Sequence, residues 1–211
     1  DQHIGRIVAE AAGAERIASE MVNEGGGIQV DGTGRVIVTR TVQLDPGRNP
    51  RLSQQDVEAE LARTIGVDSV LWLPRGLARD HETFGTRGHS DILAAFATPE
   101  VLLMHRQDSQ SHPDHVIARE NRAVAERYFA EHGRAPEIID LPAPEALRDD
   151  EGFVDYSYIN HLVINGAVLA CAFNDPADDR ALGVLREAYP GREIIGIDAR
   201  PLFARGGGIH C

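Results

Sequence analysis

The sequence has few cysteines and no long apolar run. Two cysteines among 211 residues do not form a disulfide framework, which favours a reducing, cytoplasmic setting. No stretch approaches the roughly 18–20 apolar residues that a membrane-spanning helix requires. The net charge of −12 disfavours nucleic acids and anionic membranes as partners, because both require a positive surface. The same charge suits a cationic ligand, although acidity of this size also serves solubility alone. With 42% hydrophobic and 26% charged residues, the composition is that of a globular protein.

A pattern of strand, strand, helix and strand occurs three times. In the first round, residues 27–31 and 36–39 predict strands, Ser53 is the expected N-cap of a helix that Gly66 ends, and 69–74 predict the last strand. The same order recurs at 92–97, 101–104, a helix to about 132 and 137–141, and again at 156–164, 167–171, a helix to about 189 and 193–197. A period of roughly 65 residues indicates a propeller or an array. Strands rich in Val, Ile and Leu indicate an α/β fold in which helices cover the sheets.

Both ends of the chain look like parts of further units. Residues 4–12 predict a helix of an earlier unit, and residues 206–211 predict the first strand of another. We therefore expect a single domain over residues 1–211 that lacks one or more N-terminal units.

Glycine-containing segments carry most of the candidate functional residues. In a pseudo-symmetric repeat, equivalent loops converge near the axis, so Glu24, His89, Asp91 and Cys211 are expected to meet although they are distant in sequence. The segments are 23–27, 87–91, 164–167 and 205–211.

These residue types can form a site with a cysteine nucleophile. A thiol attacks as the thiolate, which a nearby cationic histidine favours. An imidazole exchanges protons near neutral pH, so His89 can act as acid and base while Glu24 orients it. Asp91, two residues after His89, would face the same side of a strand and bind a cationic group.

Spacing alone leaves other interpretations open. Three successive glycines are more often a flexible turn than a site, and a single His-x-Asp is a weak signal. His89, Asp91, His210 and Cys211 could also form a zinc site, although no paired Cys or His-Glu-x-x-His spacing supports one. Cys171 lies in an apolar stretch and is expected in the core.

At these same residues the sequence resembles the agmatine deiminase family, which belongs with the bacterial-type peptidylarginine deiminases to the guanidine-modifying pentein superfamily. The resemblance extends from about Met21 to Cys211. It implies a pentein, an α/β-propeller of five pseudo-symmetric ββαβ units, of which about three complete units and partial ones are present here. The matching segments, in family order, are Glu24-Gly25-Gly26, Arg48-Asn49-Pro50, residues 72–77, Gly88-His89-Ser90-Asp91, residues 157–160, 165–167 and 175–176, and Gly206–Cys211 with its Ile-His-Cys.

The resemblance implies hydrolysis of agmatine to N-carbamoylputrescine and ammonia, a step of putrescine biosynthesis, without a metal or an organic cofactor. Cys211 would form a covalent amidino-thioether, and His89 would protonate the departing ammonia and then activate water. Glu24 would pair with His89 or with the guanidinium, and Asp91 would bind the guanidinium nitrogens. Gly207 and Gly208 would border the substrate. The expected partner is a small cationic guanidino compound, with a homo-oligomer as a further expectation.

The sequence departs from the family pattern in three places. It lacks the N-terminal Trp-x-Arg-Asp segment that supplies a further guanidinium-binding aspartate, and Gly208 stands where the family usually has Asn. The segment 80–87 is longer than usual, and Ile92 replaces a common Asn. These departures keep other hypotheses open: deimination of arginine, peptidyl-arginine or another guanidino compound, amidino transfer to an amine, and a pentein that binds guanidinium without catalysis.

Overall fold

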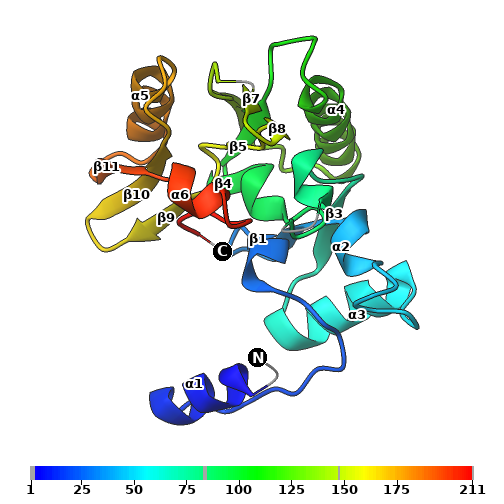
Figure 1. The fold of residues 1–211 in the computed structure, drawn as a ribbon. Coiled ribbons are helices and arrows are strands. Elements are labelled where there is room, and N and C mark those ends of the chain that lie inside the picture. The colour runs from blue at the N-terminus through cyan, green and yellow to red at the C-terminus, as the bar shows by residue number, and fades with distance from the viewer. Residues whose placement is uncertain (1–2, 83–84, 147, 211) are drawn as a thin grey trace.

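Three units of strand, strand, helix and strand succeed one another along the chain (Figure 1). The computed structural model describes all residues except 1–2, 83–84, 147 and 211. The first unit is β1 (Gln29–Val30), β2 (Arg35–Thr39), α3 (Gln54–Ile65) and β3 (Ser69–Leu73). The second is β4 (Ala94–Thr98), β5 (Val101–Arg106), α4 (Asp114–His132) and β6 (Glu137–Pro142). The third is β9 (His161–Ile164), β10 (Ala167–Ala172), α5 (Asp178–Ala188) and β11 (Glu193–Asp198).

Each unit forms a three-stranded sheet with the same pairing. The middle strand pairs antiparallel with the strand before it and parallel with the strand that follows the helix. Two parallel strands need a crossover between them, which α3, α4 and α5 provide. The predicted threefold repeat is therefore confirmed.

The first long helix begins and ends where the sequence predicts. Ser53 accepts a hydrogen bond from the backbone of Asp56, and the Asp56 side chain accepts one from the backbone of Ser53, which forms a capping box. Gly66 ends the helix in the left-handed conformation, at φ 71°. Local chemistry thus sets both boundaries of α3.

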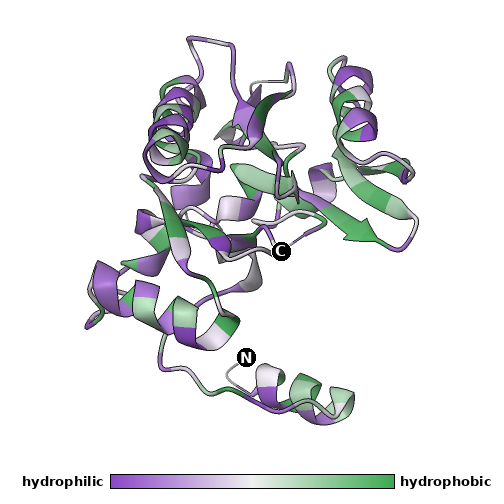
Figure 2. Ribbon diagram, turned by 180° about the vertical axis from the view of Figure 1, so that it is seen from behind, coloured by the Kyte–Doolittle hydropathy of each residue, from purple (hydrophilic) through white to green (hydrophobic). Residues whose placement is uncertain are grey.

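The middle strands β2, β5 and β10 are largely buried on both faces. Successive side chains of a strand point to opposite faces, so Val36 and Val38 pack with Val57 and Leu61 of α3, whereas Ile37 joins a larger cluster with the second and third units. Figure 2 shows apolar strands beneath helices that are largely polar on their outer sides. Because the units share this larger core, their loops are fixed relative to one another.

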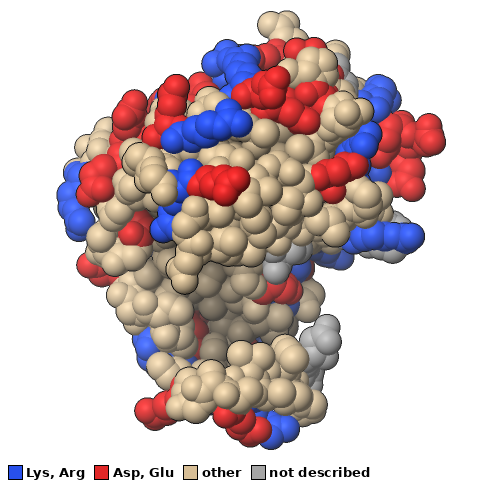
Figure 3. All heavy atoms as spheres, turned by 90° about the vertical axis from the view of Figure 1, so that its left-hand side faces the viewer, with Lys and Arg blue, Asp and Glu red and all other residues tan. Residues whose placement is uncertain are grey.

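The N-terminal helix α1 (Ile4–Ala12) stands apart from the sheets. The predicted helix 4–12 is confirmed, but none of its residues is buried, and Ile4, Ile7 and Val8 are exposed. Figure 3 shows it as a separate lobe below a hollow in the surface.

The other elements are short. They are the 3₁₀ turns η1 (Gly25–Gly27), η2 (Arg79–His81) and η3 (Ser90–Ile92), the helices α2 (Arg40–Gln43) and α6 (Arg200–Phe203), and the hairpin of β7 (Arg148–Asp149) and β8 (Gly152–Phe153). Among the described helices, none has the length and apolar character to cross a membrane.

The strands predicted at the candidate site are shorter than expected or absent. Part of the predicted strand 27–31 is the turn η1, the start of 92–97 is η3, and only 161–164 of the segment 156–164 is a strand. Residues 206–210 contain no strand, because Gly206 has φ 80° and the backbone of His210 bonds to a side chain rather than to another strand. The site is therefore built from turns at the ends of strands.

Candidate active site

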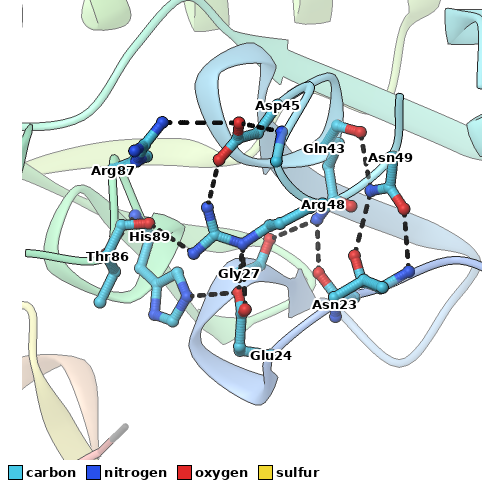
Figure 4. Close-up of polar contacts among 12 residues, drawn as sticks. Asn23, Glu24, Gly27, Gln43, Asp45, Arg48, Asn49, Thr86, Arg87 and His89 are labelled. Atoms are coloured by element: carbon cyan, nitrogen blue, oxygen red, sulfur yellow. Dashed lines mark hydrogen bonds and ion pairs between the residues drawn. The ribbon is translucent and has the colours of Figure 1, made fainter. Parts of the chain in front are cut away.

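Glu24 and His89 form the centre of the site. Glu24 precedes η1, His89 precedes η3, and His89 Nε2 lies 3.0 Å from Glu24 Oε2 (Figure 4). An ionised carboxylate only accepts hydrogen bonds, so this contact places the proton of a neutral His89 on Nε2. His89 is only 4% exposed, and its buried Nδ1 has no hydrogen-bond partner in the described part of the chain. Nδ1 is thus the ring nitrogen without an internal hydrogen bond, and it lies beside Gly26.

Gly26 lets the η1 backbone approach both His89 and Asp91. A Cβ at this position would lie 2.5 Å from Asp91 Oδ2 and 2.6 Å from His89 Nδ1, closer than real Cβ contacts. Ser90 Oγ also donates to the Gly26 carbonyl. Of the three successive glycines, the middle one therefore brings two candidate site residues together.

Asp80 organises the loop that presents His89. Its buried carboxylate accepts hydrogen bonds from Thr86 N at 2.6 Å, Gly88 N at 2.6 Å and His89 N at 3.2 Å. These bonds hold the loop through Arg87 and Gly88, whose φ values are 70° and 117°. No role for Asp80 was predicted from the sequence, where the unusual length of segment 80–87 was the only signal.

Arg48 is a second residue to which sequence analysis assigned no role. Its Nε lies 2.9 and 3.0 Å from the two oxygens of Glu24, its Nη1 donates to Asp45, and its Nη2 donates to the Thr86 carbonyl (Figure 4). Burial alone would raise the pKa of Glu24, but the hydrogen bonds from Arg48 and His89 lower it below its ordinary value. Glu24 is therefore held as the anion. The signal that pointed here was the Arg48-Asn49-Pro50 motif.

Asn160 holds the C-terminal segment at the site. Its Nδ2 donates to the His210 carbonyl at 2.5 Å, and its Oδ1 accepts from His210 N at 2.9 Å. A Cβ on Gly208 would overlap this amide, so the missing side chain allows the contact. Cys171, buried as predicted, donates from Sγ to the Asn160 carbonyl. Asn160 thus anchors the residue directly before Cys211.

These segments line one small pocket. Its walls include His89, Asp91, Asn160, Gly207 and Gly208. Burial raises the pKa of Asp91, and hydrogen bonding and charge from His210 and His89 oppose that rise. His210 Nδ1 lies 3.0 Å from Asp91 Oδ2. The ionised form of a buried carboxyl group is stabilised by a cationic partner, which offsets the loss of hydration.

The structure brings together most of the residues that the sequence selected. Glu24, His89 and Asp91 meet, and Gly207 and Gly208 lie beside the last two of them. Cys211 lies outside the described residues. The expectation that His89 and Asp91 share a strand face is wrong, because a 3₁₀ turn brings them together. The segment 164–167 does not join the site, since it forms the turn between β9 and β10.

Comparison with known proteins places the chain in a family. Residues 1–211 match the model described as Porphyromonas-type peptidyl-arginine deiminase. The chain belongs to this family. The expected pentein fold is confirmed by the ββαβ repeat and by the similarity to solved structures.

The chain is similar over its whole length to part of several longer proteins. A relative from Streptomyces coelicolor is 48% identical over 100% of this chain and 62% of its own length. Agmatine deiminase of Stutzerimonas stutzeri is 34% identical over 100% of this chain and 61% of its own length. The solved structure of agmatine deiminase of Enterococcus faecalis has a TM-score of 0.89 at 27% identity, covering 99% of this chain and 61% of that one. The chain therefore spans less than two thirds of these relatives.

Proposed function

We propose that this chain carries the reaction centre of a guanidine deiminase that hydrolyses agmatine to N-carbamoylputrescine and ammonia. The observation that carries the proposal is the pocket in which His89, held by Glu24 at 3.0 Å, lies beside Asp91 and the segment leading to Cys211. Family membership and relatives named agmatine deiminase support it.

The reaction proceeds through a covalent intermediate. The Cys211 thiolate attacks the guanidinium carbon while Asp91 binds the guanidinium nitrogens through paired N–H donors. The C–N bond breaks as His89 gives a proton to the departing ammonia, which leaves an amidino-thioether. His89 then takes a proton from water, whose oxygen attacks the same carbon, and the thiolate leaves as the ureido product forms. Every step uses groups of this chain and water, without a metal or a cofactor.

An acidic cavity next to the reaction centre favours agmatine over arginine. Asp155 lines both the small pocket and an adjoining cavity of about 270 Å³, which Glu82 and Glu151 also line. Arg79 in its wall lies 2.7 Å from Asp149 and 2.8 Å from Glu151, so its charge is already balanced. Such a cavity stabilises the ammonium tail of agmatine and repels the carboxylate of arginine.

The decisive experiment measures ammonia and ureido product from agmatine and arginine. We expect faster turnover of agmatine, no loss of activity in EDTA, and loss of activity in Cys211→Ala. Wild-type turnover by Cys211→Ala would refute the mechanism. Product formation that depends on an added amine would identify amidino transfer instead, and zinc-dependent recovery after EDTA would identify a metal site. The cytoplasmic location and a homo-oligomeric state stay predictions.

A further inference from the structure

We propose that Arg48 is a positioning residue, an internal guanidinium that holds Glu24 against His89 and keeps Glu24 from binding the substrate. The inference rests on the proposed deiminase function for its kinetic consequence. Its structural part concerns only three side chains, Arg48, Glu24 and His89.

Arg48 connects three segments that are distant in sequence. Its side chain is only 16% exposed, and each of its three nitrogens donates to a different segment: Glu24 before η1, Asp45 after α2, and the carbonyl of Thr86 in the loop that carries His89 (Figure 4). A planar fork of donors fits three such acceptors at once, which a lysine ammonium on a flexible stem does not.

The backbone on which Arg48 stands is itself anchored. Arg48 N donates to the Asp45 carbonyl at 2.9 Å. The next residue, Asn49, donates to the carbonyls of Val22 and Gln43 and accepts from Val22 N at 2.8 Å. Asn49 therefore fixes the segment that leads into Glu24 as well as the one that carries Arg48, so the distance between the two is set from both sides.

The carboxylate of Glu24 is already occupied by internal hydrogen-bond donors. Its Oε1 accepts from Arg48, and its Oε2 accepts from both Arg48 and His89. A carboxylate offers about four acceptor sites, so three of them are in use. A substrate guanidinium that bound Glu24 through two hydrogen bonds would have to displace Arg48. Of the two roles that the sequence leaves open for Glu24, the geometry points to pairing with His89, and the guanidinium falls to Asp91.

The kinetic test compares Arg48→Met and Arg48→Lys with a matched arginine elsewhere. Arg122 on α4 also bonds two carboxylates and one carbonyl, those of Glu126, Asp140 and Ile138. We expect Arg48→Met to lower kcat about 10- to 100-fold with a change in KM below about 3-fold, because orientation of the acid–base group is lost. We expect Arg48→Lys to recover less than half of that loss, and the control Arg122→Met to stay within about 2-fold of wild type.

A double-mutant cycle separates positioning from a general structural effect. If Arg48 acts through Glu24, Arg48→Met changes kcat by less than about 3-fold in a Glu24→Gln background. The same 10- to 100-fold loss in both backgrounds, or wild-type kcat in Arg48→Met, overturns the proposal.

A readout without turnover distinguishes failure of this proposal from failure of the proposed function. In ¹⁵N-histidine NMR, neutral His89 of the wild type is expected as the Nε2–H tautomer, and Arg48→Met is expected to show a mixture. An unchanged tautomer in Arg48→Met refutes the positioning role. A changed tautomer in a protein that releases no ammonia from any guanidino compound refutes the deiminase function and leaves the positioning role of Arg48 in place.

Discussion

At the scale of single residues, the space beside His89 is set by a missing side chain. Gly26→Ala places a methyl group within 2.6 Å of His89 Nδ1 and 2.5 Å of Asp91 Oδ2, so the η1 backbone must move. A displacement of about 1 Å in a reacting group costs about 100-fold in rate, and we expect a loss of that size in kcat/KM.

The neighbouring Gly25 gives the control for this prediction. A Cβ at Gly25 meets no atom within 4 Å, so Gly25→Ala is expected to keep kcat/KM within about 3-fold of wild type. Circular dichroism shows whether both variants are folded. Equal activity of the two variants would contradict the role assigned to the η1 backbone.

Asn160 supports a second prediction at this scale. Asn160→Asp keeps the shape of the side chain but removes the donor to the His210 carbonyl, so the segment before Cys211 loses one of its two anchors. We expect kcat to fall about 10- to 100-fold. The control Asn165→Asp changes an exposed residue in the β9–β10 turn and should leave kcat unchanged. Steady-state kinetics on agmatine measure both variants, and equal kcat values would count against anchoring by Asn160.

The candidate reacting groups could be predicted from the sequence, whereas the residues that hold them could not. Glu24, His89 and Asp91 carry titratable groups in glycine-flanked segments, which is a signal visible in the sequence. Arg48, Asp80 and Asn160 act through hydrogen bonds to segments at other positions in the chain. Such partners follow from how the loops pack, which spacing alone does not determine.

At the scale of elements, the cap of α3 is a local device whose contribution can be measured. Ser53→Ala removes both side-chain contacts with Asp56 and leaves a backbone N–H of the first turn without its acceptor. We expect the free energy of unfolding to fall by about 1 kcal/mol in urea titrations. The control Gln55→Ala, at an exposed position of the same helix, should change it by less than about 0.5 kcal/mol. A smaller loss in Ser53→Ala than in the control would contradict the capping role.

The elements that the sequence predicted well are those with their own start and stop signals. The helix α3 has Ser53 and Gly66 at its ends, and each of the middle strands β2, β5 and β10 contains an apolar run. The front strands were predicted too long because their first residues are drawn into turns. Gly25–Gly27 bends as η1 to reach His89, which is a tertiary contact that no local pattern encodes.

At the scale of the whole molecule, a partly buried carboxyl group, that of Asp155, makes stability depend on pH. Burial, with a further contribution from Asp80, raises the pKa of Asp155 to about 7 from 3.8. Between these pH values the folded chain binds more protons at this group than the unfolded chain. The free energy of unfolding that this group contributes therefore falls as pH rises from about 4 to 7.

Replacement of Asp155 tests this dependence. Asp155→Asn removes the titrating carboxyl group. We therefore expect the difference in unfolding free energy, variant minus wild type, to increase from pH 4 to pH 8. Chemical denaturation at each pH measures the difference. The matched variant Asp150→Asn changes an exposed residue of the β7–β8 hairpin, and its difference curve is the reference for that of Asp155→Asn. A flat curve for Asp155→Asn relative to this reference would show that the carboxyl ionises alike in both states.

The repeat was visible in the sequence because each unit is a local segment with the same order of elements. The core that the units share was not visible, since its contacts join residues of all three units. That shared core fixes the loops closely enough to place Glu24 against His89, 65 positions further along the chain.

The isolation of α1 has a consequence for the amide protons of this chain. A helix of 9 residues is too short to be stable alone in water, and no buried residue of α1 adds tertiary stabilisation. Its backbone N–H groups should therefore exchange with deuterium at rates close to those of an unstructured peptide, whatever the global stability. The amides of β2, β5 and β10 exchange only through opening of the core. The exchange rates of the α1 amides should thus be independent of the free energy of global unfolding. The exchange rates of the amides in the three middle strands should instead measure that free energy.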